Sequence, residues 1–244
     1  MTPNVRPPPF LLAGSRRYKP HLEQRPPVSA DETRVTSARV VSVNIGSVRR
    51  VEWEGEIIST GIWKSPVRGR VALRGVNFVG DDQADRTVHG GPDKAVYAYA
   101  QEDYDFWRDE HGVETQPGLF GENLTVEGIN LSDAVIGERW RVGSCVLEIA
   151  QPRLPCYKLG IRMNDPYFPR RFQAAMRMGA YLRVIEEGDV GENDDITVIA
   201  RPSHGLTLDT MVRALHDSSK AHALRAVESL PGFWRRIAAR ADDD

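Results

Sequence analysis

Apolar and polar positions alternate in short runs along most of the chain between residues 38 and 200. Val41, Val43 and Ile45 occupy every second position of the first run, which is the period of a strand with one buried face. Similar runs, bounded by glycine or other turn residues, predict strands at 48–53, 56–62, 67–73, 95–99, 123–126, 140–150, 181–185 and 196–200. Many short strands without long helices between them favour a mainly β fold, a β-barrel, over a doubly wound sheet.

Helical patterns are confined to a few segments. Two short helices are predicted at 102–108 and 169–178, inside the strand-rich region. Beyond residue 202 the period changes, because four apolar residues from Leu208 to Leu215 fall at i, i+3, i+4 and i+7. Two more helices are predicted at 220–230 and after Pro231. Three such short helices are not stable alone, so we expect them to pack as a small C-terminal domain.

The first thirty residues have a different composition from the rest. They hold seven of the sixteen prolines and five basic residues against one acid. Such a segment does not bury enough apolar surface to fold, which predicts a disordered leader, with a targeting role as the alternative. The predicted organisation is therefore a leader at 1–37, a β-barrel domain at 38–201 and a three-helix domain at 202–244.

Charge and composition narrow the class of protein. The 244 residues carry 32 Lys and Arg against 34 Asp and Glu, a net charge of −2. This balance argues against a nucleic-acid-coating protein. The longest apolar run is far shorter than the roughly 20 residues that cross a bilayer, so no membrane span is expected. Two cysteines are too few for a disulfide scaffold and favour a reducing, cytoplasmic location.

The strongest chemical signal is the segment Gln-Pro-Arg-Leu-Pro-Cys-Tyr-Lys at 151–158, directly after a predicted strand. Two prolines fix the backbone around Cys156, and Arg153 and Lys158 place positive charge near its sulfur. Such surroundings favour the thiolate, the form that attacks or binds metal. A structural loop cysteine is the alternative. Cys145, inside the predicted strand, is interpreted as a small buried hydrophobe.

Two further places carry candidate chemistry. The loop at 80–94 contains His89, which titrates near neutrality, followed by two glycines that allow close backbone approach to a ligand. A plain surface turn explains this loop equally well. The Phe-Gly-Glu-Asn-Leu segment around Asn123 and the Lys64-Ser65 pair offer groups suited to a phosphate or a heterocycle edge, although structural capping explains each one alone.

These motifs together resemble a known family. Gly-Asp-Asp-Gln-Ala-Asp at 80–85, Val-His-Gly-Gly-Pro-Asp-Lys-Ala at 88–95, Phe-Gly-Glu-Asn-Leu at 120–124 and Gln-Pro-Arg-Leu-Pro-Cys-Tyr-Lys-Leu at 151–159 occur in the order seen in the MOSC domain, in its stand-alone YiiM-like branch. The similarity covers about 38–200, and the predicted C-terminal helices resemble the small three-helix domain that ends YiiM-like proteins.

The resemblance implies a β-barrel, a molybdenum cofactor (molybdopterin), and reduction of N-hydroxylated bases or related N-oxygenated compounds to the amine. It assigns the molybdenum ligand to Cys156. His89 is then the best candidate proton donor, with Asp93 orienting it or sharing that role. The cofactor anchors expected from their charge and hydrogen-bonding groups are Lys64, Arg86, Lys94, Asn123 and Arg153.

Electrons would come from a partner reductase, since the chain has no Gly-x-Gly-x-x-Gly dinucleotide fingerprint. The other expected partner is the small N-hydroxylated substrate, and a homodimer is one option for assembly. Two other functions remain open: a sulfurtransferase that carries a persulfide on Cys156, and a non-catalytic carrier of the molybdenum cofactor, for which His89 would be dispensable.

Overall fold

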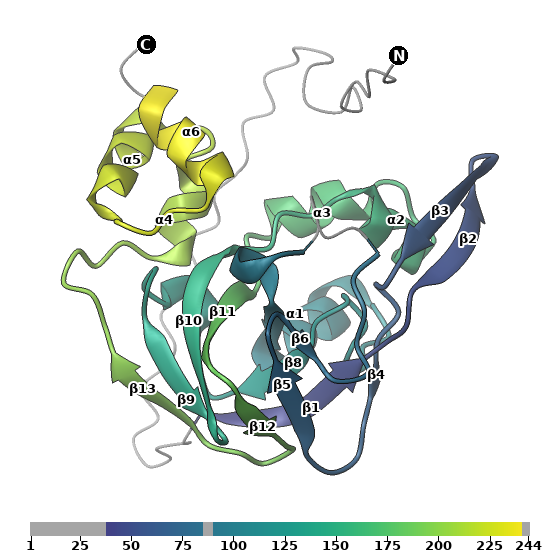
Figure 1. The fold of residues 1–244 in the computed structure, drawn as a ribbon. Helices are drawn as coiled ribbons and strands as arrows, with labels where there is room; N and C mark the ends of the chain where they lie inside the picture. Colours follow the sequence, from purple (N-terminus) through teal and green to yellow (C-terminus); the bar gives the residue numbers. More distant parts are fainter. Residues whose placement is uncertain (1–37, 85–89, 241–244) are drawn as a thin grey trace, which may run out of the picture. The chain divides into compact units, whose positions relative to one another are not determined.

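The computed structural model describes residues 38–84 and 90–240, so the predicted leader lies outside the described residues (Figure 1). One eight-stranded sheet dominates. Its strands lie in the order β13 (Ile196–Ala200), β9 (Arg139–Val142), β10 (Cys145–Pro152), β11 (Ala180–Glu186), β7 (Val96–Ala100), β8 (Leu124–Glu127), β1 (Arg39–Ile45) and β4 (Ser65–Pro66). Neighbouring strands are antiparallel except for the parallel pair β7 and β8, so the sheet is mixed.

The expectation of a closed barrel is wrong for the described residues. Their sheet has two ends, β13 and β4. The isolated bridge between Arg39 and Asp195 and backbone hydrogen bonds such as Val40 N to Asp194 O, at 2.9 Å, join the start of β1 to the segment before β13, but β1 and β13 share no ladder that would close the sheet. At the other end β4 is only two residues long, and its Pro66 has no amide hydrogen to extend a ladder. The confirmed part of the prediction is the mainly β character.

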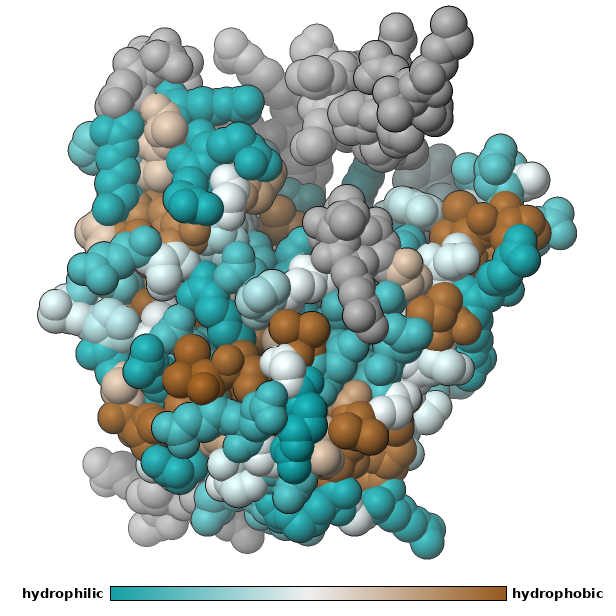
Figure 2. Space-filling view, in the orientation of Figure 1, coloured by the Kyte–Doolittle hydropathy of each residue, from teal (hydrophilic) through white to brown (hydrophobic). Residues whose placement is uncertain are grey.

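Two smaller sheets accompany the main one, and the three-stranded one shares its hydrophobic core through Leu73, Phe78 and Val190. In the hairpin of β2 (Arg49–Trp53) and β3 (Glu56–Thr60), both central turn residues have positive φ, at 52° and 82°, which is the geometry that two-residue hairpins favour. The other small sheet joins β12 (Gly188–Val190), β5 (Val71–Arg74) and β6 (Asn77–Phe78). Figure 2 shows apolar surface in separate patches, one of them on the hairpin, where Ile57 is exposed.

Three helices accompany the sheet: α1 (Gln101–His111), α2 (Tyr157–Met163) and α3 (Phe168–Ala174). The first confirms the helix predicted at 102–108. The predicted helix at 169–178 ends early, because Met176 has a positive φ of 56°. An aromatic cluster includes Tyr99 of β7, Trp107 of α1 and Phe172 of α3, with the last two rings stacked. This cluster supports the strand and loops that carry the candidate site.

The C-terminal segment holds three helices where three were predicted, α4 (Leu208–Arg213), α5 (Ser218–Ala223) and α6 (Gly232–Arg240). The helix predicted at 220–230 ends early, because a 3₁₀ turn at Leu224–Ala226 follows α5 and the backbone is extended at Val227. The N-terminal residues of α4 and α5 are of types that favour helix caps. Thr207 accepts a hydrogen bond from Thr210 N, and Asp217 accepts two from the first turn of α5. Met211 and Trp234 are fully buried in the hydrophobic cluster that also contains the sheet residues. The boundary of a separate domain at 202 stays a prediction. Within the described ranges, no helix combines the length and apolar character needed to cross a membrane.

Candidate functional site

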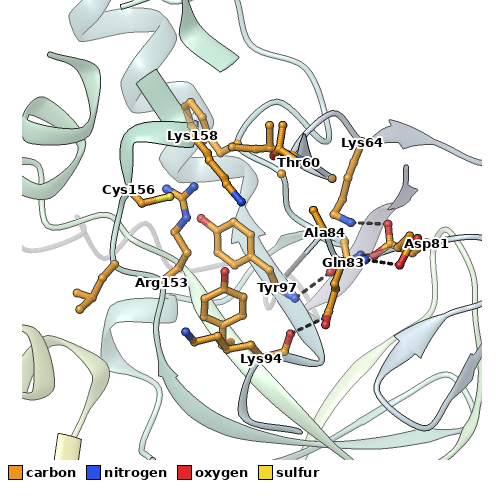
Figure 3. Close-up of a pocket in the computed structure, with 18 residues that line it drawn as sticks. Thr60, Lys64, Asp81, Gln83, Ala84, Lys94, Tyr97, Arg153, Cys156 and Lys158 are labelled. Carbon is orange, nitrogen blue, oxygen red and sulfur yellow. Dashed lines mark hydrogen bonds and ion pairs between the residues drawn. The ribbon is translucent and has the colours of Figure 1, made fainter. Parts of the chain in front are cut away.

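A pocket of about 110 Å³ lies where the ends of several strands and their loops meet (Figure 3). Its walls come from segments far apart in the sequence, including all three places that carry candidate chemistry. The lining residues are Thr60, Gly61, Ile62, Lys64, Asp81, Asp82, Gln83, Ala84, Lys94, Tyr97, Phe120, Gly121, Asn123, Arg153, Leu154, Cys156, Lys158 and Tyr181.

Cys156 reaches this pocket because the chain turns out of the sheet after β10. Extended backbone with φ −130° and ψ 174° places Cys156 immediately before α2, and its carbonyl accepts a hydrogen bond of 2.9 Å from Leu159 N. The residue is half-buried and its thiol is not in a disulfide. A sulfur in this position is accessible to a ligand in the pocket, which is what nucleophilic or metal-binding chemistry requires.

Cys145 has the opposite environment and confirms its interpretation as a buried hydrophobe. It begins β10, pairs with Val142 of β9, and is 0% exposed. Burial raises the pKa of its thiol to about 11. The two cysteines are therefore chemically distinct, and only Cys156 lines the pocket.

Arg153 supplies a buried positive charge beside Cys156 (Figure 3). The residue is 5% exposed, and its guanidinium lies over the rings of Tyr97 and Phe172 at 5.6 and 5.4 Å from their centroids. Its Nη1 is buried and has no hydrogen-bond partner among the described residues. Leaving a buried charged donor without a partner is costly, so this atom marks a place for an acceptor, and an anionic one would fit best.

Lys64 and Asn123 meet at one carboxylate, that of Asp81. Lys64 forms an ion pair with Oδ1, and Asn123 Nδ2 donates to Oδ2 at 2.9 Å. Both partners of the ion pair are buried, and burial lowers the pKa of Lys64 against the opposing effect of Asp81. Asn123 also accepts a hydrogen bond of 3.2 Å from Tyr97 N, so its amide ties β7 to the loop that carries Asp81.

The pocket has more positive than negative charge. Lys64, Lys94, Arg153 and Lys158 line it, against the two carboxylates Asp81 and Asp82. Lys94 enters from the 3₁₀ turn Pro92–Lys94, whose start at Gly91 has a φ of 87°. Gln83 contributes a buried Oε1 that has no partner in the part of the chain described. Gln83 Oε1 as an acceptor and Arg153 Nη1 as a donor are therefore both available to bind a polar ligand in the pocket.

Some predicted site residues fall elsewhere. Asp93 does not line the pocket, and its carboxylate accepts a hydrogen bond of 2.6 Å from Arg183 Nε. Arg86 and His89 lie outside the described residues, so their roles stay predictions.

Sequence reasoning missed the two tyrosines of the pocket, Tyr97 and Tyr181. They sit directly opposite each other on β7 and β11, with ring centroids 5.2 Å apart. Burial raises the pKa of both phenols, which keeps them as neutral hydrogen-bonding groups. A usable signal was that each tyrosine is the second residue of a strand that follows a loop with at least one glycine, Gly90 and Gly91 before β7 and Gly179 before β11.

Glu122, between Gly121 and Asn123, has a structural role. It is fully buried and accepts hydrogen bonds from Tyr104 Oη at 2.6 Å and Thr125 Oγ1 at 2.9 Å, and from the amides of Gly118 and Phe120. Burial raises its pKa. The Phe-Gly-Glu-Asn-Leu segment therefore folds around the buried carboxylate of Glu122. Phe120, Gly121 and Asn123 of this segment line the pocket, and Glu122 does not.

Comparison with known proteins shows which family this chain belongs to. The family model described as MOSC domain matches residues 85–197. The uncharacterized protein YflK of Bacillus subtilis is 36% identical over 200 residues, 80% of this chain and 90% of YflK. Protein YiiM of Escherichia coli is 29% identical over 196 residues, 75% of this chain and 88% of YiiM. The crystal structure of YiiM from Geobacillus stearothermophilus shares the fold with a TM-score of 0.69 at 24% identity, covering 84% of this chain and 98% of that one.

The chain belongs to the MOSC-domain family, and within it to the YiiM-like proteins. A further relative is a protein named Reductase from Gibberella moniliformis, 32% identical over 167 residues. The match covers 67% of this chain and 29% of that longer protein.

Proposed function

We propose that this chain is a molybdenum cofactor-dependent reductase of N-hydroxylated bases or related N-oxygenated compounds, with Cys156 as the molybdenum ligand. The observation that carries the proposal is the pairing of an accessible Cys156 with the unpartnered, buried Nη1 of Arg153 in one positively charged pocket. A thiolate suits a metal that already carries the dithiolene sulfurs of its pterin.

The residues present fit this cofactor. The described residues hold no cluster of three or more His, Cys, Asp or Glu placed to bind a metal ion, so a metal that brings its own ligands suits a single thiolate. Arg153 and Lys94 would receive the anionic part of the cofactor. Lys64 and Asn123 both bind the Asp81 carboxylate and so shape one wall of the pocket. A direct contact of these two residues and of Arg86 with the cofactor is part of the proposal.

The reaction takes up two electrons and two protons, breaks the N–O bond, and releases water and the amine. The bound cofactor would supply the electrons. The chain would supply the protons, and His89 is the proposed donor. Because Arg183 holds the carboxylate of Asp93, an orienting role fits Asp93 better than a donating one.

Electrons would reach the site from a separate reductase protein. In the relative named Reductase, the part that matches this chain takes up 29% of the length, which leaves room in that protein for a further domain that could supply electrons. A cytoplasmic location and a homodimer remain predictions.

The deciding experiment compares Cys156→Ala with Cys145→Ala in the full-length chain made by a host that synthesises the cofactor. Molybdenum content and the reduction of an N-hydroxylated base by a chemical electron donor are measured for both. We expect Cys156→Ala to lose both and Cys145→Ala to keep both. Equal losses would contradict the assignment, and sulfur released by cyanide from a molybdenum-free natural chain would support the sulfurtransferase instead.

A further inference from the structure

The amide of Gln151 connects the C-terminal helices to the pocket. Gln151 lies on β10, two residues before Arg153, and is 5% exposed. Its Oε1 accepts a hydrogen bond of 3.0 Å from Nε1 of the fully buried Trp234 in α6. Its Nε2 donates to the carbonyl of Asp93 at 3.2 Å. One buried side chain thus joins α6 to the turn Pro92–Lys94.

Arg183 of β11 makes a second connection between the same two parts. Its Nε donates to Asp93 Oδ1 at 2.6 Å, and its Nη2 donates to the carbonyl of Ser229, just before α6, at 2.6 Å. Glu148 of β10 accepts from Nη1 at 2.9 Å and fixes the guanidinium on the sheet. Asp93 is therefore held through its backbone by Gln151 and through its carboxylate by Arg183.

The turn that these contacts hold has little stability of its own. It is a single 3₁₀ turn of three residues, it begins at Gly91 with positive φ, and no side chain caps it. Yet its last residue, Lys94, lines the pocket together with Cys156 (Figure 3). Because Lys94 directly follows Asp93 in this turn, the contacts that fix Asp93 also fix the backbone from which the Lys94 side chain extends.

We propose that the C-terminal helices position the pocket: through Gln151 and Arg183 they fix the turn Pro92–Lys94 and hold the charge of Lys94 in the pocket that Cys156 lines. Gln151, Arg183 and Trp234 are then positioning residues, and they touch neither substrate nor cofactor. The inference concerns the pocket of the proposed function and relies on it for its biological meaning.

The test measures the electrostatic surroundings of Cys156 in the full-length, cofactor-free chain. The thiolate displaces iodide from anionic iodoacetate or from neutral iodoacetamide, and the ratio of the two rate constants reports the positive charge near the sulfur. Trp234→Phe keeps the ring and removes the N–H, while Arg183→Lys keeps the charge and removes the fork. Each is expected to lower the ratio about threefold to tenfold, the effect of displacing one nearby charge.

Lys94→Gln should lower the ratio by the same factor, and adding Trp234→Phe to it should cause no further fall. The matched control is Trp140→Phe, which removes an equally buried indole hydrogen bond, to Glu138 Oε1 at 2.7 Å, on a strand that does not line the pocket. It should leave the ratio unchanged.

An unchanged ratio in both positioning variants, or an equal fall in Trp140→Phe, would overturn the proposal. If Trp234→Phe does not fold, Arg183→Lys decides alone. Alkylation of Cys156 needs no molybdenum, so this test does not depend on the proposed function. If the proposed function is wrong, the molybdenum content of the natural chain will show it, and the alkylation ratios will still test the positioning role.

Discussion

At the scale of single residues, the two cysteines show how position determines the chemistry of one functional group. Cys145 is enclosed by the sheet, whereas Cys156 opens into a charged pocket. Their difference was predictable from the sequence, because one falls in an apolar run and the other between prolines and cations. The size of the difference needed the structure, since it depends on how completely the neighbouring strands cover Cys145.

The raised pKa of Cys145 makes the free energy of unfolding depend on pH. The thiol titrates near 9.0 when unfolded and at about 11 when folded. Its stabilising contribution is complete below pH 9 and is lost as the pH rises toward 11, because the unfolded chain releases the proton first. We expect the stability advantage of the natural chain over Cys145→Ala to shrink over this range by at most about 1.4 kcal/mol per pH unit. Urea unfolding of both chains measures it, and a constant difference would contradict the prediction.

The buried ion pair of Lys64 and Asp81 gives a second residue-level prediction. Removing only the cation, as in Lys64→Met, leaves a buried carboxylate without its charge partner and should cost about 3 to 5 kcal/mol. The double variant Lys64→Met with Asp81→Asn should recover most of that loss, because both charges are then gone. Denaturant unfolding of the two variants checks this. The exposed pair of Arg108 and Asp105 serves as a control, and Arg108→Met should change stability little.

At the scale of elements, alternation and turn residues predicted most strands close to their observed bounds. The run at 140–150 is two strands, β9 and β10, because Gly143 adopts a positive φ of 57° and reverses the chain. The helix α2 was missed. It is two turns long, too short for a clear helical period, and contains Gly160, a poor helix former. A Cβ there would approach the carbonyl of Asp165 to 3.0 Å, a contact between non-adjacent residues that the local pattern does not carry.

For the candidate site, too, local sequence motifs predicted single residues but not the contacts between residues far apart in the chain. The sequence singled out Cys156, Arg153, Lys64, Lys94 and Asn123, and the fold brings all of them to one pocket. The contact between Tyr97 and Tyr181 could not be predicted from the sequence, since it depends on the register of β7 with β11. Likewise, the attachment of Asp93 to Arg183 joins residues 90 positions apart.

The C-terminal helices supply the prediction at this scale. Deleting 203–244 uncovers the sheet residues that pack against Met211 and Trp234, and truncating one buried tryptophan side chain to alanine already costs about 3 to 5 kcal/mol of stability. We expect the truncated chain to bind a hydrophobic dye and to lose solubility or cooperative thermal unfolding. Deleting only 241–244 is the control and should change neither. A truncated chain that folds well but has lost turnover would leave two roles for these helices. A lower ratio of iodoacetate to iodoacetamide rate constants at Cys156 would indicate the positioning role, and an unchanged ratio would make the helices a docking element for the electron donor.

At the scale of the whole molecule, folding and cofactor binding should be linked through Arg153. The cofactor-free chain buries a guanidinium whose Nη1 lacks a partner among the described residues, and an anion in the pocket would relieve that cost. Binding to the folded state alone stabilises it by about 2.7 kcal/mol at a ligand concentration 100 times Kd, which for a chain of this size raises Tm by about 5 to 10 °C.

The last prediction is that this rise in Tm depends on Arg153. Calorimetry of cofactor-loaded and cofactor-free chains should show the increase for the natural sequence and a much smaller one for Arg153→Met. Without the cofactor, Arg153→Met should unfold at the same temperature as the natural chain or higher, because it removes a buried charge along with its unmet hydrogen-bonding need. The control Arg141→Met, at an exposed position of β9, should keep the full increase. An equal increase in Arg153→Met would mean that the guanidinium serves the fold through Tyr97 and Phe172 and makes no contact with the cofactor.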